Sequence, residues 1–325
     1  MQKTPIRKIV MLTLPWLLAA GLSVSASAGD LTWTQLFPAT SPSPRSIAAM
    51  AYDPVSQKIV LFGGYDGTQY LNDTWTFDGS NWTEISAATA PPARTNASMA
   101  FDRDGAKLVM FGGYDGHNYL GDTWLWNGAT STWTQATNAS GPTPVTGPML
   151  FLDPIAHRVD NYGGYDGFLY QLTTYQWTGN TWQKLNTPTE PSARSVAATA
   201  ADYAGGNIVM FDGLGSVNPY NTWTWDGNSW TQQFPAIQPE SLYSAGAAYD
   251  PALKGVVVFG GGNGGLDVND TWEWKDGEWS QLVPAQSPPA REAHGMANFR
   301  VSGHIVIFGG IEQNQLLNDT WELTD

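Results

Sequence analysis

The amino-acid sequence predicts an all-β fold, a six-bladed β-propeller in which each blade has four antiparallel strands. A hydrophobic run that ends in an aromatic residue followed by Gly-Gly, or by Asp-Gly in one copy, recurs six times, with a spacing of 48 to 51 residues between successive aromatic residues. A period of about 50 residues is typical of propeller blades. The chain also has 35 glycines and 21 prolines at regular positions, which suits short strands joined by turns. The six aromatic residues are Phe62, Phe111, Tyr162, Phe211, Phe259 and Phe308.

Each repeat contains four strand-like segments, which in the first repeat are residues 46–52, 58–62, 74–77 and 82–85. Asp53-Pro54 and Asp78-Gly79 are turn signals between the first two and the last two segments. The second segment is apolar at consecutive positions, which predicts burial on both faces between neighbouring blades. Gly63 and Gly64 follow it, and we expect a larger residue, the tryptophan of the repeat, to approach the backbone there.

The two ends of the chain predict how the ring closes. Residues 31–35 match the fourth-strand pattern around Trp82 rather than any first strand. The chain ends at Trp321-Glu322-Leu323, a third strand with no fourth strand after it. The N-terminal strand is therefore expected to complete the sixth blade, which removes an open sheet edge.

A second pattern is repeated along the chain, after each hydrophobic run. It consists of Asp-Thr-Trp or a close variant, and a further tryptophan comes later in most repeats. The copies are Asp73-Thr74-Trp75, Asp122-Thr123-Trp124, Asn221-Thr222-Trp223, Asp270-Thr271-Trp272 and Asp319-Thr320-Trp321, with Thr174-Tyr175 as the divergent one. The succession of hydrophobic run, Gly-Gly, Asp-Thr-Trp and later Trp resembles the kelch repeat. The resemblance implies a propeller over essentially all of residues 29–325, but kelch propellers include both enzymes and binding proteins.

The N-terminus has the pattern of a secretory signal. Lys3, Arg7 and Lys8 precede a largely apolar run, and Ala26-Ser27-Ala28 is a small-x-small cleavage site. We therefore expect residues 1–28 to be a signal peptide and residues 29–325 a single propeller domain that is secreted or periplasmic. An uncleaved anchor is the alternative, but Pro15 and Gly21 interrupt the run, which is short for a spanning helix.

Composition limits the possible partners and cofactors. Cleavage after residue 28 removes three basic groups and takes the formal charge from −14 to −17, which disfavours nucleic acid and anionic membranes as partners. The chain has no cysteine, which excludes disulfides and a lipid-anchored cysteine. We expect a monomer without a cofactor or a metal.

The first three repeats share a loop tetrapeptide, Gly-Tyr-Asp-Gly, that the other three lack. Loops on a rigid scaffold commonly carry binding residues. Aromatic rings beside carboxylates suit a saccharide or a partner protein, whereas in a structural role the Tyr would pack on the next blade and the Asp would cap its own turn. The candidate residues are Tyr65, Asp66, Tyr114, Asp115, Tyr165 and Asp166, with Tyr70, His117, Asn118, Tyr119, Phe168 and Tyr170 in the same loops.

Four arginines occupy the position before the first strand of their repeats. They are Arg45, Arg94, Arg194 and Arg291, and Val145 and Leu242 replace them in the third and fifth repeats. A ring of arginines at a channel mouth can hold a carboxylate or sulfate through paired hydrogen bonds. An arginine after proline is also common in kelch repeats, so a structural role is the alternative.

Catalytic patterns are scarce in the sequence. Galactose oxidase, a copper enzyme that the propeller resembles, requires a tyrosine crosslinked to cysteine, and this chain has no cysteine. The four histidines, His117, His157, His294 and His304, lack metal-ligand spacing. Glycoside hydrolysis needs two paired carboxylates, and the sequence does not pair Glu190, Glu240, Glu292 or Glu312.

Two hypotheses about function follow. The first is a secreted, non-catalytic propeller that binds a glycan or a partner protein through its loop face. The second is a sugar-modifying enzyme similar to the periplasmic sialic-acid mutarotases, which would use the arginines for a carboxylate and His294 or a nearby glutamate for proton transfer. We favour the first because no acid and base pair can be identified in the sequence.

Overall fold

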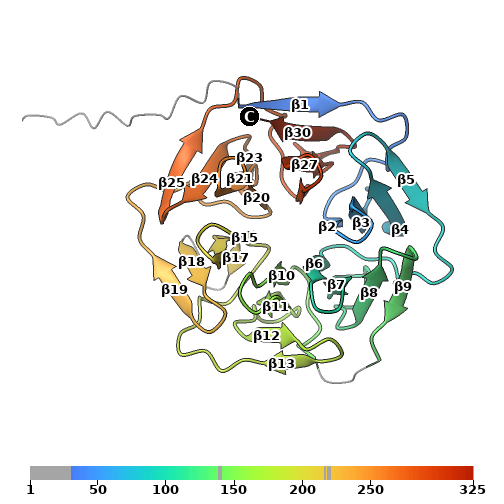
Figure 1. The fold of residues 1–325 in the computed structure, drawn as a ribbon, viewed down its shortest axis with the longest axis horizontal. Helices are drawn as coiled ribbons and strands as arrows, with labels where there is room; N and C mark the ends of the chain where they lie inside the picture. Colours follow the sequence, from blue (N-terminus) through green and yellow to red (C-terminus); the bar gives the residue numbers. More distant parts are fainter. Residues whose placement is uncertain (1–30, 138–140, 216, 218–220, 325) are drawn as a thin grey trace, which may run out of the picture.

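The computed structural model describes residues 31–137, 141–215, 217 and 221–324, and these residues form a ring of six four-stranded antiparallel sheets around a central axis (Figure 1). The described residues contain strands and turns but no helix, so they include none long and apolar enough to cross a membrane. The predicted signal peptide, residues 1–28, lies outside the described residues.

The first three blades each follow the chain from the axis outward. Blade 1 contains β2 (Ala49–Asp53), β3 (Lys58–Tyr65), β4 (Tyr70–Phe77) and β5 (Trp82–Ile85). Blade 2 contains β6 (Ser98–Asp102), β7 (Lys107–Phe111), β8 (Thr123–Asn127) and β9 (Thr132–Gln135). Blade 3 contains β10 (Met149–Leu152), β11 (Val159–Tyr162), β12 (Thr174–Trp177) and β13 (Trp182–Lys184).

The last three blades repeat this order. Blade 4 contains β15 (Ala198–Asp202), β16 (Asn207–Phe211), β18 (Thr222–Trp225) and β19 (Trp230–Gln233). Blade 5 contains β20 (Gly246–Asp250), β21 (Gly255–Phe259), β24 (Thr271–Lys275) and β25 (Glu278–Leu282). Blade 6 contains β26 (Gly295–Phe299), β27 (His304–Phe308), β30 (Thr320–Thr324) and β1 (Thr32–Leu36). Six two-residue strands lie in the loops of blades 4 to 6. They are β14 (Arg194–Ser195), β17 (Leu214–Gly215), β22 (Gly262–Asn263), β23 (Leu266–Asp267), β28 (Ile311–Glu312) and β29 (Gln315–Leu316).

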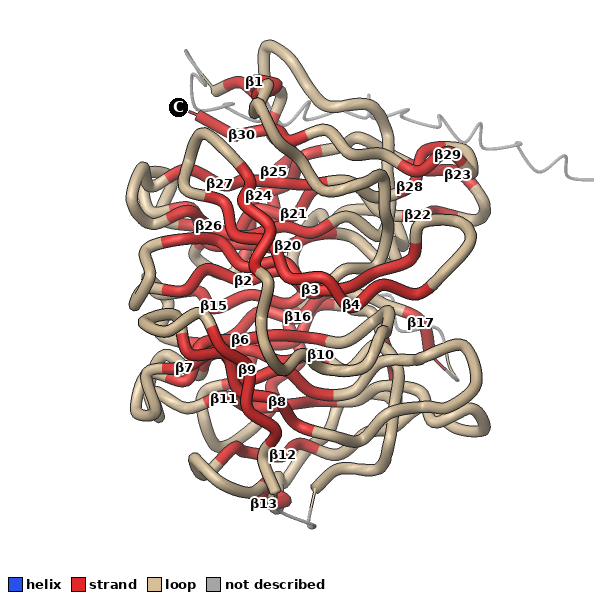
Figure 2. The backbone as a smooth tube through the Cα atoms, turned by 90° about the vertical axis from the view of Figure 1, so that its right-hand side faces the viewer, coloured by secondary structure: helices blue, strands red, loops and turns tan. Residues whose placement is uncertain are grey.

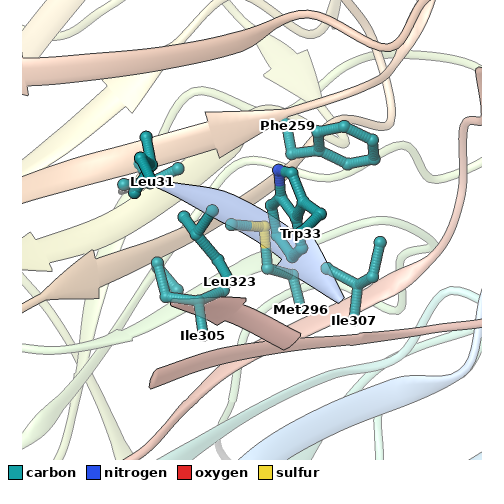
Figure 3. Close-up of a cluster of buried hydrophobic side chains, with 9 residues drawn as sticks. Leu31, Trp33, Phe259, Met296, Ile305, Ile307 and Leu323 are labelled. Atoms are coloured by element: carbon teal, nitrogen blue, oxygen red, sulfur yellow. The ribbon is translucent and has the colours of Figure 1, made fainter. Parts of the chain in front are cut away.

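Ring closure by the N-terminal strand is confirmed. β1 pairs with β30 in antiparallel register, with Trp33 opposite Leu323. Trp33 is fully buried, its ring centre lies 5.0 Å from that of Phe259 in blade 5, and it joins a cluster that contains residues from both ends of the chain (Figure 3). The chain ends thus meet in one blade, and no outer strand of blade 6 is missing.

The second strand of each blade is buried on both faces, as the consecutive apolar residues predict. Ile59, Val60, Leu61 and Phe62 of β3 are all almost completely inaccessible. Their side chains alternate between two core clusters, because Val60 packs toward blade 2 and Ile59 packs toward blade 6. The core is therefore a set of apolar layers between adjacent blades.

Tryptophans of the outer strands connect neighbouring blades by a repeated hydrogen bond. Each donates its indole N–H to the threonine hydroxyl in the third strand of the preceding blade, at 2.8 to 3.2 Å. The six pairs are Trp33 with Thr271, Trp82 with Thr320, Trp133 with Thr74, Trp182 with Thr123, Trp230 with Thr174 and Trp279 with Thr222. The threonine of the Asp-Thr-Trp pattern therefore satisfies a buried indole across every blade interface.

The expectation that a tryptophan approaches the paired glycines is wrong. A Cβ on Gly63 would lie 2.6 Å from the backbone oxygen of Arg94, which belongs to the next blade. A Cβ on Gly64 would lie 2.8 Å from the backbone oxygen of Ser46. Both glycines have positive φ, 66° and 104°, so the neighbouring backbone and the turn geometry together require glycine there.

The ring has two different faces (Figure 2). One face, which we call the loop face, carries the loops after the second and the fourth strands, including β17, β22, β23, β28 and β29. The opposite face, which we call the turn face, carries the short turns between the first and second strands and between the third and fourth strands. The innermost strands line the central channel between the two faces.

Candidate functional site

The Gly-Tyr-Asp-Gly loops of blades 1 to 3 are tight hairpins on the loop face. In blade 1 the strands continue into the loop, where Tyr65 pairs with Tyr70 after a bulge between Phe62 and Gly64. In blades 2 and 3 the equivalent bridges join Tyr114 to Tyr119 and Tyr165 to Tyr170. The sequence predicts that the strands end before these loops. In the structure, the two tyrosines of each loop still pair beyond the glycines, and this pairing makes each loop rigid.

The three loop aspartates cap their own turns. Asp66 accepts hydrogen bonds from the backbone N–H groups of Thr68 and Gln69, both at 2.8 Å. The Gln69 N–H, followed by the Thr68 hydroxyl, lowers the pKa of Asp66 to about 2. Asp115 and Asp166 cap the two corresponding amides of their loops at 2.7 to 2.8 Å. These carboxylates are ionised at neutral pH and already hold their turns, which is the structural role that the sequence left open.

The tyrosines form one continuous row of rings across three blades. Successive ring centres lie 4.9 to 5.9 Å apart, alternating between a pair within one loop and a pair between adjacent loops. The order is Tyr65, Tyr70, Tyr114, Tyr119, Tyr165 and Tyr170. We call these six residues the tyrosine row. Edge and tilted contacts at such spacings are favourable for aromatic rings, so the row ties three loops together.

Glycines of the tetrapeptides seat the second tyrosine of the preceding loop. A Cβ on Gly116 would lie 2.5 Å from the ring of Tyr70, and a Cβ on Gly167 would lie 2.4 Å from the ring of Tyr119. One part of each of these rings is therefore covered by the backbone of the next blade. Inter-blade packing of the tyrosines, the structural alternative considered from the sequence, is observed, and all six rings nevertheless stay half-exposed.

The row ends at blade 3 in a group of exposed apolar side chains. Phe168 is 90% exposed and Leu169 is 67% exposed at the tip of the third loop, and Leu172 is also exposed. The Gly-Tyr-Asp-Gly tetrapeptide is not repeated in blade 4, where Leu214 is 40% exposed at the start of the corresponding loop. We call Phe168, Leu169 and Leu172 the apolar tip.

The four predicted arginines are buried within their own blades. Arg94 donates to both carboxylate oxygens of Asp122 at 2.6 and 2.8 Å and to the backbone oxygen of Gly112 at 3.0 Å. Arg45 with Asp73 and Arg291 with Asp319 repeat this pairing, whereas Arg194 donates to the Asn221 side chain at 2.9 Å. Each guanidinium group is at most 2% exposed. These contacts correspond to the structural role that the sequence left as the alternative. Anion binding by these arginines stays a prediction.

The aspartate of the Asp-Thr-Trp pattern therefore has two partners that sequence reasoning did not find. Asp122 binds Arg94 and also accepts the indole N–H of Trp124 at 2.7 Å. Burial raises the pKa of Asp122, but the hydrogen bond and the charge of Arg94 outweigh it and lower the pKa below its usual value. The 28-residue separation between arginine and aspartate recurs in blades 1, 2 and 6, and this spacing is the sequence signal that could have revealed the pair.

The histidine of the enzyme hypothesis is buried, and two of the candidate glutamates are engaged in hydrogen bonds. His294 is buried at the loop-face end of the channel, and burial lowers its pKa to about 3, which leaves its imidazole neutral. It packs on Phe259 at 5.6 Å between ring centres. Glu190 accepts hydrogen bonds from Thr174 and Thr187, and Glu240 accepts one from Asn263 at 2.7 Å. Within the described chain, no three histidine or carboxylate side chains are placed to share a metal ion.

The family comparison agrees with this architecture. The model of the KLHDC2/KLHL20/DRC7 Kelch-repeats domain matches residues 24–213, more than half of the 325-residue chain. The chain belongs to the kelch-repeat family. No curated protein matches it in sequence. Kelch domains commonly serve as protein-binding modules, so the propeller is a scaffold suited to binding a partner protein.

Proposed function

We propose that this kelch propeller is a non-catalytic binding module that engages a partner protein through the loop face of blades 1 to 3. The observation that carries the proposal is the continuity between the rigid tyrosine row and the exposed apolar tip. Phe168 and Leu169 project at one end of an aromatic surface that the hairpin bridges hold in place. Protein interfaces are enriched in aromatic residues, and a few such anchors supply most of the binding energy.

A protein suits this surface better than a neutral glycan does. Sugar stacking requires a free ring face, but the rings of Tyr70 and Tyr119 lie against the glycine backbone of the next loop. The hydroxyls of Tyr65 and Tyr165 donate to the carbonyls of Gly67 and Gly167 at 2.9 and 2.8 Å, so their O–H groups are occupied. The loop aspartates are likewise engaged with their turns. The most exposed side chains of the surface, Phe168 and Leu169, are apolar, and apolar anchors recognise a protein surface.

The proposal includes export and the absence of catalysis. The basic, apolar and small-residue segments of residues 1–28 support transfer out of the cytoplasm and cleavage after Ala28. The formal charge of −17 that remains favours a partner without a strongly acidic binding surface. The propeller then acts as a monomer that presents its loop face to the partner.

A peptide-display selection on the purified protein tests the proposal. Peptides selected on the wild-type propeller are expected to lose at least about tenfold in affinity for a Phe168→Ser, Leu169→Ser variant, as the removal of interface anchors does. Phe234→Ser is the matched control because this phenyl group is 83% exposed, comparable to the 90% of Phe168, but belongs to the outer edge of blade 4. Both variants change exposed side chains, so both should keep the wild-type melting temperature.

Two results would contradict the proposal. In the first, the selected peptides bind the apolar-tip variant as tightly as they bind the wild-type protein. In the second, selection yields no peptide while a glycan array yields a ligand whose binding requires the tyrosine row, which would favour the carbohydrate hypothesis. A coupled assay for interconversion of sugar anomers on the same sample examines the enzyme alternative directly.

A further inference from the structure

The central channel contains a cavity at its turn-face end, and the proposed function does not use this cavity. It has a volume of about 530 Å³, within the range of small-molecule sites, and it is lined by the innermost strands of all six blades. Its inner wall is mostly apolar, with Met50, Met99, Leu150 and Met296 around the axis. This end of the channel opens on the face opposite the tyrosine row.

The rim of this cavity is aromatic. Tyr52, Phe101 and Tyr249 come from the innermost strands, and Tyr203 comes from the first turn of blade 4. Tyr203 and Tyr249 meet edge to face, with ring centres 5.2 Å apart. The rim therefore offers aromatic surface to the apolar part of a ligand.

Arg300 places a positive charge on this rim. Its guanidinium group lies over the ring of Tyr203, 5.0 Å from the ring centre, and donates a hydrogen bond to the Tyr203 hydroxyl. The contact joins a turn of blade 6 to a turn of blade 4, so the positive charge of Arg300 lies across the turn-face opening of the channel. Tyr52 of blade 1 lines the same cavity, and the positive charge of Arg300 partly offsets the rise in the Tyr52 pKa that burial causes.

Arg300 has no carboxylate partner within the described chain, in contrast to the paired arginines of the blades. Arg103 lies in the adjoining recess of about 460 Å³, which shares Phe101, Leu152 and Tyr203 with the channel cavity. Its guanidinium group lies 3.3 Å from a ring nitrogen of His157, and no ion pair joins it to a carboxylate of the described residues. In a chain with an excess of acidic residues, two arginines without acidic partners at one mouth form a local site for an anion.

The nearby aspartates do not cancel this charge by direct contact. Asp53, Asp153 and Asp202 are buried and accept hydrogen bonds from the backbone amides of their own turns. Their carboxylates therefore serve the turns, whereas Arg300 and Arg103 are exposed on the rim. The arrangement combines an apolar channel, an aromatic rim and cationic groups at the entrance.

The geometry points to a binding site for a small amphiphilic carboxylate, with its apolar body in the channel and its carboxylate beside Arg300. The site is separate from the loop face, so it can be occupied whether or not a protein partner is bound there. Arg300 retains guanidinium N–H groups beyond the one given to Tyr203, and paired N–H donors fit a carboxylate well.

Titration of the full propeller with octanoate, and with octanol as the uncharged analogue, tests the site. With methionine methyl groups labelled for NMR, octanoate is expected to shift the signals of Met50, Met99 and Met296, which line the channel. Met110 and Met210 are fully buried outside the channel and should not shift. Unchanged signals from the three channel methionines would overturn the proposal.

Three variants separate charge from shape. Arg300→Gln is expected to weaken octanoate binding about tenfold and leave octanol binding unchanged, since a hydrogen bond to a charged group is lost. Ala247→Met should weaken both ligands because it fills the channel with the residue that blades 1, 2 and 6 carry at the same register. Arg158→Gln is the control, because this arginine lies on the same face but is paired with Asp104 at 3.5 Å. A specific carboxylate site would be refuted if Arg158→Gln lost as much affinity for octanoate as Arg300→Gln does. It would also be refuted if Arg300→Gln lost no affinity for octanoate.

Discussion

Removal of the Trp33 side chain is the sharpest test of how the ring is held closed. Trp33 is fully buried, packs on Phe259 of blade 5 and donates its indole N–H to the Thr271 hydroxyl at 3.2 Å. A Trp33→Ala substitution should cost about 3–5 kcal/mol for the lost packing and the cavity. The unpaired Thr271 hydroxyl adds about 1 kcal/mol. At about 2 °C per kcal/mol for a chain of this size, the melting temperature should fall by roughly 8 °C or more.

Two further variants divide this effect into its parts. Trp33→Phe keeps an aromatic ring but removes the N–H, so it should cost about 1–2 kcal/mol. Trp182→Ala removes the equivalent tryptophan of blade 3, which donates to Thr123 at 2.9 Å but does not join the chain ends. Thermal and denaturant unfolding measure the three stabilities, and hydrogen exchange locates the opening.

The closure argument makes a specific distinction between the two alanine variants. In Trp33→Ala, the amides of β1 and β30 should exchange faster than in the wild-type protein, because β1 is an outer strand with β30 as its one strand neighbour. Its other backbone hydrogen bonds join Leu31 and Trp33 to Ala285 and Gln286, beside the Trp33 ring. In Trp182→Ala, exchange in β1 should not change. A loss below about 1 kcal/mol in Trp33→Ala, or equal exchange in β1 for both variants, would refute the reasoning.

Three other predictions concern different parts of the molecule. Arg94→Met should destabilise the fold by about 2–4 kcal/mol because it leaves Asp122 partly buried and unpaired, whereas Asp122→Asn should cost less because Asn221 serves Arg194 in blade 4; chemical denaturation compares them. Burial, followed by the charge of Asp153, raises the pKa of Asp160 to about 8, so its contribution to stability is greatest below the unfolded value of 3.8 and is lost as the pH rises toward 8. The wild-type protein should therefore lose stability over this range by at most on the order of 1.4 kcal/mol per pH unit, and Asp160→Asn should flatten the profile. Mass spectrometry of the exported protein should show cleavage after Ala28, and recovery of intact, membrane-associated Met1 would indicate an anchor instead.

The ring architecture could be predicted because each repeat gives the same information independently. The six aromatic residues set the blade count, and the fourth-strand pattern at residues 31–35 set the closure, which β1 and β30 confirm. Burial of the second strands followed from their consecutive apolar residues. The repeat period, the pattern of apolar residues and the strand patterns at the two chain ends can all be recognised in the sequence without knowledge of side-chain contacts.

The contacts between segments were harder to predict. The neighbours of Gly63 and Gly64 are backbone atoms, which leave no side-chain signal in the sequence. The four arginines form a recognisable set in the sequence, but their partners lie 27 or 28 residues away, so the spatial pairing is visible only in the fold. The sequence signal of the tyrosine row is the five-residue spacing between the two tyrosines of each of the three loops, as in Tyr114 and Tyr119.

The residues that recur in most blades and the residues proposed to bind ligands are different sets in this propeller. The arginine, the aspartate and the threonine of the repeat satisfy one another or a buried indole, so these polar groups maintain the ring and have little capacity left for a ligand. Binding groups must therefore be residues that differ from blade to blade. The apolar tip at Phe168 occurs in one loop of blade 3, and the Arg300 contact with Tyr203 occurs between single turns of blades 6 and 4. Because the scaffold residues recur in most blades and these groups do not, substitutions at the two proposed sites are expected to change binding without changing the blade interfaces.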